Sequence, residues 1–318
     1  MLESAETQVD AEKIAATVAI EDLGDEVYEK RGLGVLAWIG IGWLVFIIGI
    51  ALLAPVLPLK NPMIGDYLHP NASVFSPGHI LGSDASGRDV LSRVIWGARA
   101  SLLLAICSVA LGTLIGGFLG LLAGFRGRAT DSVLSGFTNI LLAFPQLVLA
   151  LTLVSVFAPL RTASNGNAPP AHEWGHRLLV VILAVGIVSV PILARITRAS
   201  ALSWTQREFV MAARAQGAAD KRVMFREVLP NVLPAMLSIA LLGVAIVLVL
   251  EGALAVFGVS IQEPNPSWGN MIFSQLSDLS ASPAVWIVPS ILIFVTVLAL
   301  NYLGDVVRSR FDVRESVL

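Results

Sequence analysis

Six long apolar runs without any Asp, Glu, Lys, Arg or His constrain this sequence most strongly. A helix that crosses the roughly 30 Å hydrocarbon core of a membrane needs about 20 apolar residues, and each run approaches or exceeds that length. None of them alternates apolar and polar residues as the strands of an outer-membrane barrel do. The runs are Val35 to Leu57, Ala100 to Gly124, Ser132 to Leu160, Leu178 to Ala194, Val228 to Leu250 and Ala284 to Gly304. They predict an all-α membrane protein with six transmembrane helices.

Composition supports a membrane protein and excludes several other classes. Of the 318 residues, 56% are hydrophobic and only 14% are charged, which is too little polar surface for a soluble globule of this size. The net charge of −2 and the lack of a clustered basic face argue against a nucleic-acid partner. The single cysteine, Cys107, excludes an intrachain disulfide framework and a Cys-rich metal site. Membrane lipid is therefore the expected surrounding.

The distribution of Lys and Arg predicts the orientation. Most of these residues fall before the first run, between the second and third, between the fourth and fifth, and after the last, so the positive-inside rule places both termini in the cytoplasm. The N-terminal segment is acidic, unlike a cleavable signal peptide. The expected divisions are an acidic cytoplasmic tail (1–34), a first transmembrane helix (35–57), an extracytoplasmic loop with an interfacial helix (58–99), a five-helix core (100–304) with a cytoplasmic loop (196–231), and a cytoplasmic C-terminal tail (305–318).

Small residues and prolines indicate how the spans pack. Glycine recurs every fourth residue from Gly112 through Gly116 and Gly120 to Gly124. This repeat predicts a face for close helix contact. The alternative is that these glycines only fill the sequence and have no packing role. Prolines inside apolar runs are tolerated where neighbouring helices satisfy the freed carbonyls. These prolines are Pro145, Pro191 and Pro289.

The cytoplasmic loop is predicted to be helical. Gln206 to Gly217 consists of good helix formers and stops at a glycine suited to a C-terminal cap. Asp220 is expected to cap a second short helix that ends before Pro230. Phe209 and Met211 could enter a groove on a partner protein. An amphipathic loop that lies on the membrane surface is the alternative.

The segment before the second run, Leu81 to Leu102, predicts a short helix on the outer membrane surface. Ser86 precedes Asp89 by three residues, as in a capping box, and Asp89 and Arg93 are predicted to form an ion pair one helical turn apart. This pattern indicates an interface anchor.

One motif raises a different function. His172-Glu173-x-x-His176 has the spacing that places two imidazoles on one helix face to bind zinc, with the glutamate as general base. A membrane metalloprotease is therefore an alternative. Against it, two prolines precede the motif in a short outer loop, a glycine interrupts it, and a third zinc ligand would be needed. We expect no metal site.

The sequence carries no energy source of its own. It lacks the G-x-x-x-x-G-K-[ST] phosphate-binding loop. A stand-alone secondary carrier, the other alternative, would need ionisable groups within its spans, where Glu251 is the one acid near membrane depth. We therefore predict no catalytic residue and a transport protein that takes its energy from a partner through the 196–231 loop.

Several motifs in fixed order resemble the permease subunits of ABC importers, and more narrowly those of the oligopeptide/dipeptide branch. The loop motif is Met211-Ala-Ala-x-x-x-Gly217 followed by Leu229-Pro230-Asn231, although the family has an acidic residue where Met211 stands. The others are G-S-D-A-S-G-R-D-V-L-S-R (82–93), A-F-P (143–145), E-G-A-L-A-V-F-G-V (251–259), P-S-W-G-N-M (266–271) and N-Y-L-G-D (301–305).

The resemblance implies a type I ABC importer permease in a bacterial inner membrane that imports peptides, or nickel, glutathione or another small solute. It implies a sister permease, two ATPase subunits that bind ATP and magnesium, and an extracytoplasmic binding protein, with no cofactor in this chain. The implied ATPase contacts are Glu208, Phe209, Met211, Ala212, Ala213, Arg214, Gly217, Leu229 and Pro230. Path candidates are Pro145 and Glu251. The outer-loop motif residues are Asp84, Gly87, Arg88, Asp89, Arg93, Trp268, Gly269 and Asn270.

Overall fold

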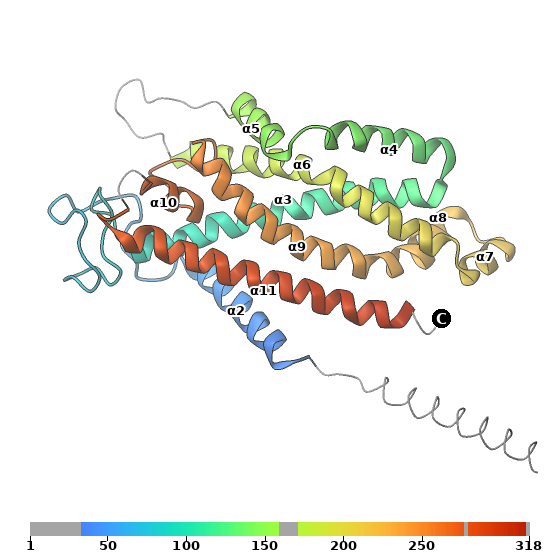
Figure 1. The fold of residues 1–318 in the computed structure, drawn as a ribbon, viewed down its shortest axis with the longest axis horizontal. Coiled ribbons are helices and arrows are strands. Elements are labelled where there is room, and N and C mark those ends of the chain that lie inside the picture. The colour runs from blue at the N-terminus through green and yellow to red at the C-terminus, as the bar shows by residue number, and fades with distance from the viewer. Residues whose placement is uncertain (1–32, 159–170, 277–278, 316–318) are drawn as a thin grey trace, which may run out of the picture. The chain divides into compact units, whose positions relative to one another are not determined.

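The computed structural model describes residues 33–158, 171–276 and 279–315 (Figure 1). The predicted acidic tail lies almost wholly outside them. The chain divides into two units between Ile39 and Gly40, and α3 to α11 belong to the second. The helices are α2 (Val35–Leu53), α3 (Val90–Arg126), α4 (Arg128–Leu142), α5 (Gln146–Phe157), α6 (Ala171–Thr205), α7 (Glu208–Ala215), α8 (Asp220–Arg222), the π-helix η1 (Val223–Val228), α9 (Leu229–Val256), α10 (Trp268–Ser274) and α11 (Pro283–Glu315).

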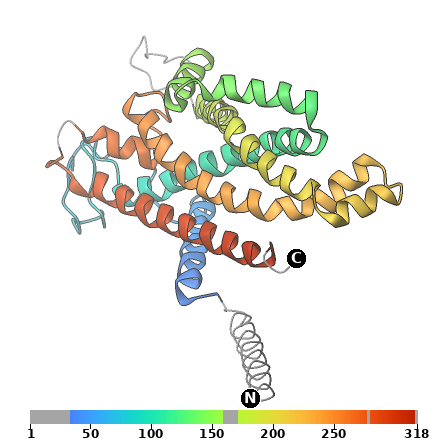
Figure 2. The ribbon, with the colours of Figure 1, turned by 45° about the vertical axis from the view of Figure 1, so that its right-hand side comes forward.

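The helices confirm an all-α membrane protein. Among the described residues, five helical stretches are long and apolar enough to cross a membrane, and α4 with α5 makes a sixth if the bent pair is counted as one span. α9 and α11 run side by side (Figure 2). α7 and α8 lie at one end of the second unit, called the α7 end below, and α10 lies at the other, the α10 end (Figure 1). α11 continues well past the last apolar run, so the segment expected as a C-terminal tail is largely helical.

The backbones of α3 and α6 approach each other closely at the glycines of α3. A Cβ atom added to Gly116 would lie 2.4 Å from the carbonyl oxygen of Val190, and one added to Gly120 would lie 2.3 Å from that of Ala194. The other two glycines of the same face also meet α6. The predicted small-residue face is therefore confirmed, and α6 is its partner. A larger side chain at these positions would force the two helices apart.

The third apolar run is broken, where we expected one span. Pro145 stands at the N-terminal cap of α5, and α4 and α5 are bent by 84° relative to each other. Proline has no N–H to continue the helical ladder and disfavours a helical conformation in the preceding residue, which explains the break. Pro191 and Pro289, in contrast, lie within α6 and α11, which remain single helices.

The expected interfacial helix is not separate, because α3 runs unbroken from its cap into the span. The carboxylate of Asp89 accepts a hydrogen bond from the amide of Ser92 at 2.9 Å and so caps the helix. Val90 and Val94 are buried in an apolar cluster, which makes these turns part of the packed protein. The predicted Asp89–Arg93 ion pair is wrong, because Asp89 serves as the cap and the guanidinium of Arg93 binds other carboxylates.

Two arginines and two carboxylates hold the segment before α3 against the loop before α10. Arg93, which is 1% exposed, donates from Nη2 to Oε1 of Glu263 at 2.7 Å, and its Nε lies 3.5 Å from Oδ2 of Asp84. Arg88 donates to Asp84 at 2.7 Å and also pairs with Glu263. We call these four residues the outer clamp. It joins parts of the chain that are far apart in the sequence.

A tight turn at Gly87 gives the outer clamp its shape. Gly87 has φ +74°, and an added Cβ would lie 2.0 Å from the carbonyl oxygen of Asp66. Within the turn, Oδ1 of Asp84 accepts from the amides of Ser86 and Arg88, each at 2.9 Å. Only glycine fits this position without strain, which accounts for glycine in the motif.

Replacing Gly116 by Ala is expected to lower the free energy of unfolding by about 1–3 kcal/mol, because the new Cβ would press on the backbone of α6. Gly136→Ala in α4 is the matched control, since a Cβ there meets nothing within 4 Å and alanine favours a helix. Denaturant unfolding of the purified protein in detergent measures both. Equal stability of the two variants would contradict the close packing of α3 on α6.

Arg93→Met is expected to lower the free energy of unfolding by about 1–3 kcal/mol, because it leaves Asp84 buried with one cation fewer. The loss is smaller than for a fully buried pair, since Glu263 is 39% exposed. Arg99→Met, which removes only a guanidinium 5.5 Å from the centre of the Trp96 ring, should cost about 0.5–1 kcal/mol. If denaturant unfolding finds the two variants equally stable, the outer clamp makes no specific contribution to the free energy of unfolding.

Candidate functional site

A helical segment, residues 206–229, connects α6 with α9 at the α7 end (Figure 1). Its first helix, α7, is terminated by Gly217, which follows the cap residue and has φ +80°. The amide of Gly217 donates to the carbonyl of Arg214 at 3.0 Å, and the amide of Ala218 donates to that of Ala213 at 3.1 Å. These are the two hydrogen bonds of a Schellman C-terminal cap. The predicted end of this helix is therefore confirmed.

The second half of the segment differs from the prediction. Asp220 is the first residue of α8, with Ala219 at the cap position, and α8 continues through η1 and past Pro230 into α9. Pro230 has no N–H to donate to the carbonyl one α-helical turn before it, and the wider π-helical turn accommodates this missing hydrogen bond. The side-chain amide of Asn231 also donates to the carbonyl of Glu227 at 2.6 Å. The helix therefore passes through the proline where we expected it to end.

α7 is anchored on one side by an apolar cluster. Val210 is fully buried there with Phe125 of α3 and with Met224 and Val228 of η1. The guanidinium of Arg214 lies over the ring of Phe125, 5.0 Å from its centre. Ala213 and Leu229 pack against the same cluster. These contacts hold α7 against three other elements.

The opposite side of α7 is open. Phe209 is 38% exposed and Met211 is 54% exposed, and Glu208 and Ala212 are exposed as well. The residues that the sequence analysis grouped as partner contacts thus fall into two sets. Those just named face outward, while Ala213 and Leu229 face the cluster and help to fix the helix.

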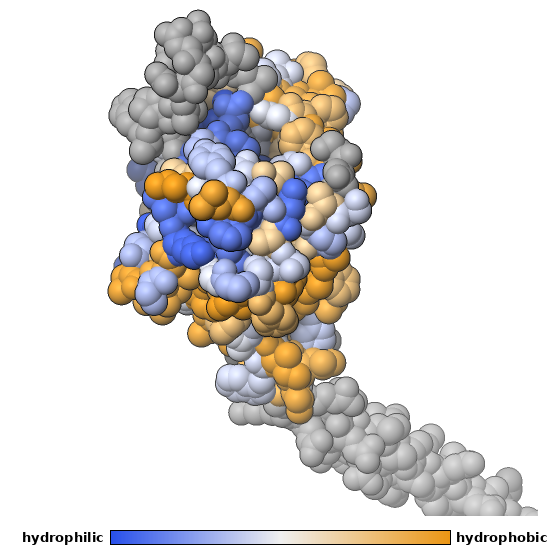
Figure 3. All heavy atoms as spheres, turned by 90° about the vertical axis from the view of Figure 1, so that its left-hand side faces the viewer, coloured by the Kyte–Doolittle hydropathy of each residue, from blue (hydrophilic) through white to orange (hydrophobic). Residues whose placement is uncertain are grey.

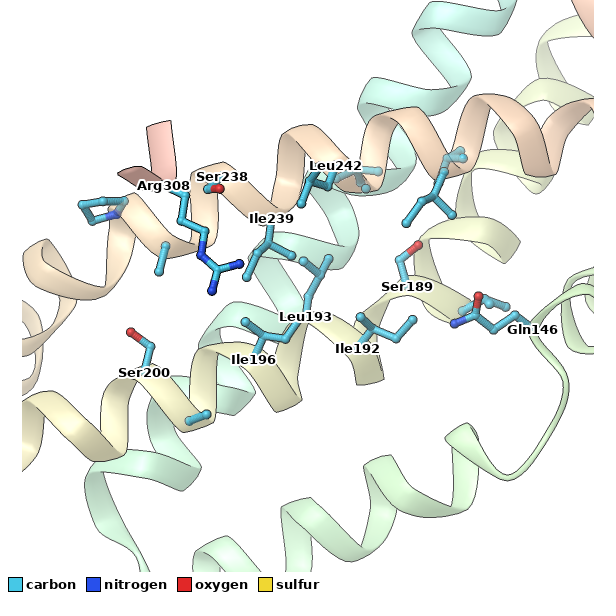
Figure 4. Close-up of a pocket in the computed structure, with 18 of the residues that line it drawn as sticks. Gln146, Ser189, Ile192, Leu193, Ile196, Ser200, Ser238, Ile239, Leu242 and Arg308 are labelled. Atoms are coloured by element: carbon cyan, nitrogen blue, oxygen red, sulfur yellow. The ribbon is translucent and has the colours of Figure 1, made fainter. Parts of the chain in front are cut away.

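A cavity of about 720 Å³ lies between α6 and α9 (Figure 4). Its wall is mainly apolar and comes chiefly from these two helices. The uncharged polar residues of the lining are Gln146, Ser189, Ser200, Asn231 and Ser238. Arg308 of α11 is the only charged residue of the lining within the part of the chain that the structure describes. Pro145, a predicted path residue, directly precedes Gln146. Trp204 and Pro230, which flank the 206–229 segment, also line the cavity.

Glu251, the other predicted path residue, does not line this cavity. It is fully buried, and its carboxylate accepts hydrogen bonds from the hydroxyls of Ser260 and Ser267, each at 2.8 Å, and of Ser101 at 3.2 Å. The amide of Gly269 adds a fourth contact at 3.3 Å. A buried carboxylate needs such donors. Glu251 therefore joins α9, α10 and α3 at the α10 end.

The Trp268-Gly269-Asn270 motif forms the start of α10. The indole N–H of Trp268 donates to the carbonyl of Val94 at 3.1 Å, and Ser267 and Asn270 form a capping box. A Cβ on Gly269 would lie 2.8 Å from a carboxylate oxygen of Glu251. This short helix was not predicted from the sequence, because Ser267-x-x-Asn270 has the spacing of a capping box but carries Asn in place of the usual Glu or Gln. Figure 3 shows that hydrophilic residues gather across the middle of the α10 end.

The His172-Glu173-x-x-His176 motif lies in the first turns of α6, where we expected a loop. The side chains of His172 and Glu173 are outside the described residues. Within the described part of the chain, no three His, Cys, Asp or Glu side chains are grouped as metal ligands.

The chain matches the sequence profile of the family described as binding-protein-dependent transport system inner membrane component over residues 116–316. It is 32% identical to the dipeptide transport system permease protein DppC of Alkalihalophilus pseudofirmus, over 90% of this chain and 88% of the relative. It is 33% identical to the di/tripeptide transport system permease protein DppC of Pseudomonas aeruginosa, with the same shares covered. The glutathione transport system permease protein GsiD of Pectobacterium atrosepticum is 35% identical over 74% of this chain and 73% of its own.

Solved structures support the fold. A chain of the inward-facing MetNI methionine ABC transporter superposes with a TM-score of 0.53 at 18% identity, over 68% of this chain and 95% of its own. A chain of an amino acid ABC transporter gives a TM-score of 0.50 at 19% identity, over 69% and 94%. The chain therefore belongs to the family of binding-protein-dependent transport system inner membrane components and is a multi-pass permease component of an ABC importer.

Proposed function

We propose that this chain forms part of the pore of an ATP-driven importer for di- and oligopeptides. The observation that carries this substrate class is the similarity, over nine-tenths of the chain, to permeases named for dipeptides and di/tripeptides. The relative named for glutathione, itself a tripeptide, supports the same class. Import of labelled peptides by the reconstituted complex tests the proposal, with nickel and free sugars as competing cargoes.

The proposed topology has six spans with both termini in the cytoplasm, and α4 and α5 count as one broken span. The support is the concentration of basic residues near the α7 end, which the positive-inside rule assigns to the cytoplasm. These residues are Arg195, Arg198, Arg207, Arg214, Lys221, Arg222, Arg226 and Arg308. The α10 end then faces outward, where an extracytoplasmic binding protein would dock on the loops that the outer clamp and Glu251 hold in place.

α7 is the proposed contact with the ATPase subunits. This chain lacks a phosphate-binding loop, so two partner subunits would bind ATP and magnesium. Phe209 and Met211 offer them an exposed apolar surface, and Val210 fixes that surface to the rest of the subunit. When ATP closes the ATPase pair, α7 would be displaced and would move α6 and α9 with it, a change biased by a ligand bound on another subunit.

The cavity is the proposed contribution of this subunit to the translocation path, and a sister permease would supply the opposite wall. The apolar wall with scattered hydroxyls and amides suits peptides whose side chains vary, since it fixes no charge pattern along most of its length. The bend at Pro145 would border this path, and Glu251 would stabilise its outer end without touching the cargo.

Met211→Asp is expected to reduce co-purification of the ATPase subunits at least about tenfold, because a charge would have to be buried in a contact that methionine fills with apolar atoms. Met63→Asp is the matched control, since Met63 is a similarly exposed methionine, at 41%, outside the 206–229 segment. Pull-down in mild detergent through a tag on this chain measures both. The sister permease should remain with either variant, and full ATPase retention by Met211→Asp would refute the contact.

Ser200→Trp is expected to lower peptide import at least about tenfold while the ATPase subunits stay bound, because the indole would fill part of the cavity. Ser203→Trp, on the same helix but not in the lining, should import normally. Uptake into proteoliposomes with the loaded binding protein outside measures both. Normal import by Ser200→Trp would mean that the cargo passes elsewhere.

A further inference from the structure

Trp204 belongs both to the cavity and to the surroundings of α7. It lies in the last turn of α6 and lines the cavity. Its ring also contacts the ring of Phe209 in α7, with 6.1 Å between the centroids and an angle of 59° between the planes. The guanidinium of Arg207 lies over the indole at 5.3 Å from its centre. One side chain therefore contacts the cavity, the exposed face of α7 and the connection between the two helices.

The connection between α6 and α7 at Trp204 is short and packs against an apolar cluster. Only Gln206 and Arg207 separate the two helices, and the amide of Arg207 donates to the carbonyl of Trp204 at 3.2 Å. The indole packs against the apolar cluster that contains Val210. At the other end of the 206–229 segment, Pro230 lines the same cavity. The segment is thus attached to the cavity wall at both ends.

We infer that Trp204 is a positioning residue that transmits the position of α7 to the α7 end of the cavity. This inference rests on the proposed function, because it assumes that ATPase subunits move α7. Closely packed side chains pass a displacement on to their neighbours instead of absorbing it, and an indole has few internal rotations with which to yield. When α7 shifts, the ring must move with Phe209 and Arg207, and the cavity changes shape at its α7 end.

The coupling also acts in the reverse direction. A peptide in the cavity that favours one position of Trp204 favours the matching position of α7, since the coupling between two binding events is reciprocal. Without the ring, the ATPase rate should therefore no longer respond to the arrival of peptide, while the ATPase subunits and the binding protein still bind. A residue that merely fills the apolar cluster would instead affect folding and assembly.

The test compares the assembled importer in lipid with and without peptide-loaded binding protein. The measured quantity is the ratio of the stimulated to the basal ATPase rate. For Trp204→Ala we expect normal co-purification of both ATPases, and a ratio lowered at least about fivefold, the lower limit of typical coupling between sites. Trp204→Phe should keep most of the wild-type ratio, because a ring remains to contact Phe209.

Trp96→Ala is the matched control, because Trp96 also carries an arginine over its ring but does not line the cavity. Its ratio should stay normal. Trp204→Leu keeps apolar volume in the cluster without a ring, and it replaces the alanine variant if that variant does not assemble. Its ratio of stimulated to basal ATPase rate should fall as far as that expected for Trp204→Ala.

Four outcomes overturn the inference. The first is an unchanged ratio in Trp204→Ala or Trp204→Leu. The second and third are an equal decrease of the ratio in Trp96→Ala or in Trp204→Phe. The fourth is failure of both Trp204→Ala and Trp204→Leu to retain the ATPases that the wild type retains. If the wild type itself retains no ATPase, the proposed function fails, and this result is distinct from the other four.

Discussion

The close approach of α3 to α6 sets the framework for the rest of the subunit. At Gly116 and Gly120, the two backbones leave no room for a Cβ atom. Lipid tails are as apolar as the helices, so a hydrophobic driving force does not hold the pair together within a membrane, and van der Waals contact between small residues does. The pair is therefore rigid as a unit. Any movement of α6 that the importer requires must therefore carry α3 with it, and movement of one element relative to another must take place where contacts are looser.

Two such elements adjoin the cavity. α4 and α5 are separated by the break at Pro145, and within α4 only Thr138 is buried among the described residues. α9 is reached through the π-helix η1, whose wider turn precedes Pro230. Both irregular points lie next to residues that line the cavity. The α10 end, in contrast, is held by the outer clamp and by the hydrogen bonds to Glu251. The irregular points of the backbone therefore lie beside the cavity, whereas the α10 end is held by side-chain hydrogen bonds and ion pairs.

Local chemistry made part of this arrangement predictable from the sequence. The apolar runs predicted the spans, the repeat of glycine every four residues predicted the tight face, and Gly217 predicted the end of α7. The partner of the glycine face could not be predicted, since any span might have met it. The role of Glu251 was also hidden, because three of its hydrogen-bond donors come from Ser101, Ser260 and Ser267, and nothing in the sequence indicates that they meet.

The errors share a cause. A capping pattern, a proline or an opposite-charge pair fixes what a residue can do locally, but tertiary contacts select among the possibilities. Asp89 was free to pair with Arg93 or to cap α3, and it caps. Proline ended a helix at Pro145, whereas at Pro230 a π-helical turn let the helix continue. Of the two predicted path residues, Pro145 directly precedes a residue of the cavity lining and Glu251 lies elsewhere; the lining itself was not predicted, because it comes from several helices and no motif marks it.

The departure at Met211 bears on the proposed contact between α7 and the ATPase subunits. The resemblance implies an acidic residue at this position, and the charged residues of α7 that could replace its contact are Glu208 and Arg214. Arg214 already stacks on Phe125 and so helps to anchor α7. Glu208 lies in the first turn of α7, where its charge interacts favourably with the helix dipole. The outward centre of α7 is therefore apolar, and burial of Phe209 and Met211 would supply most of the binding free energy there. A contact of this kind depends little on salt, and a flexible methionine can adapt as its partner changes shape.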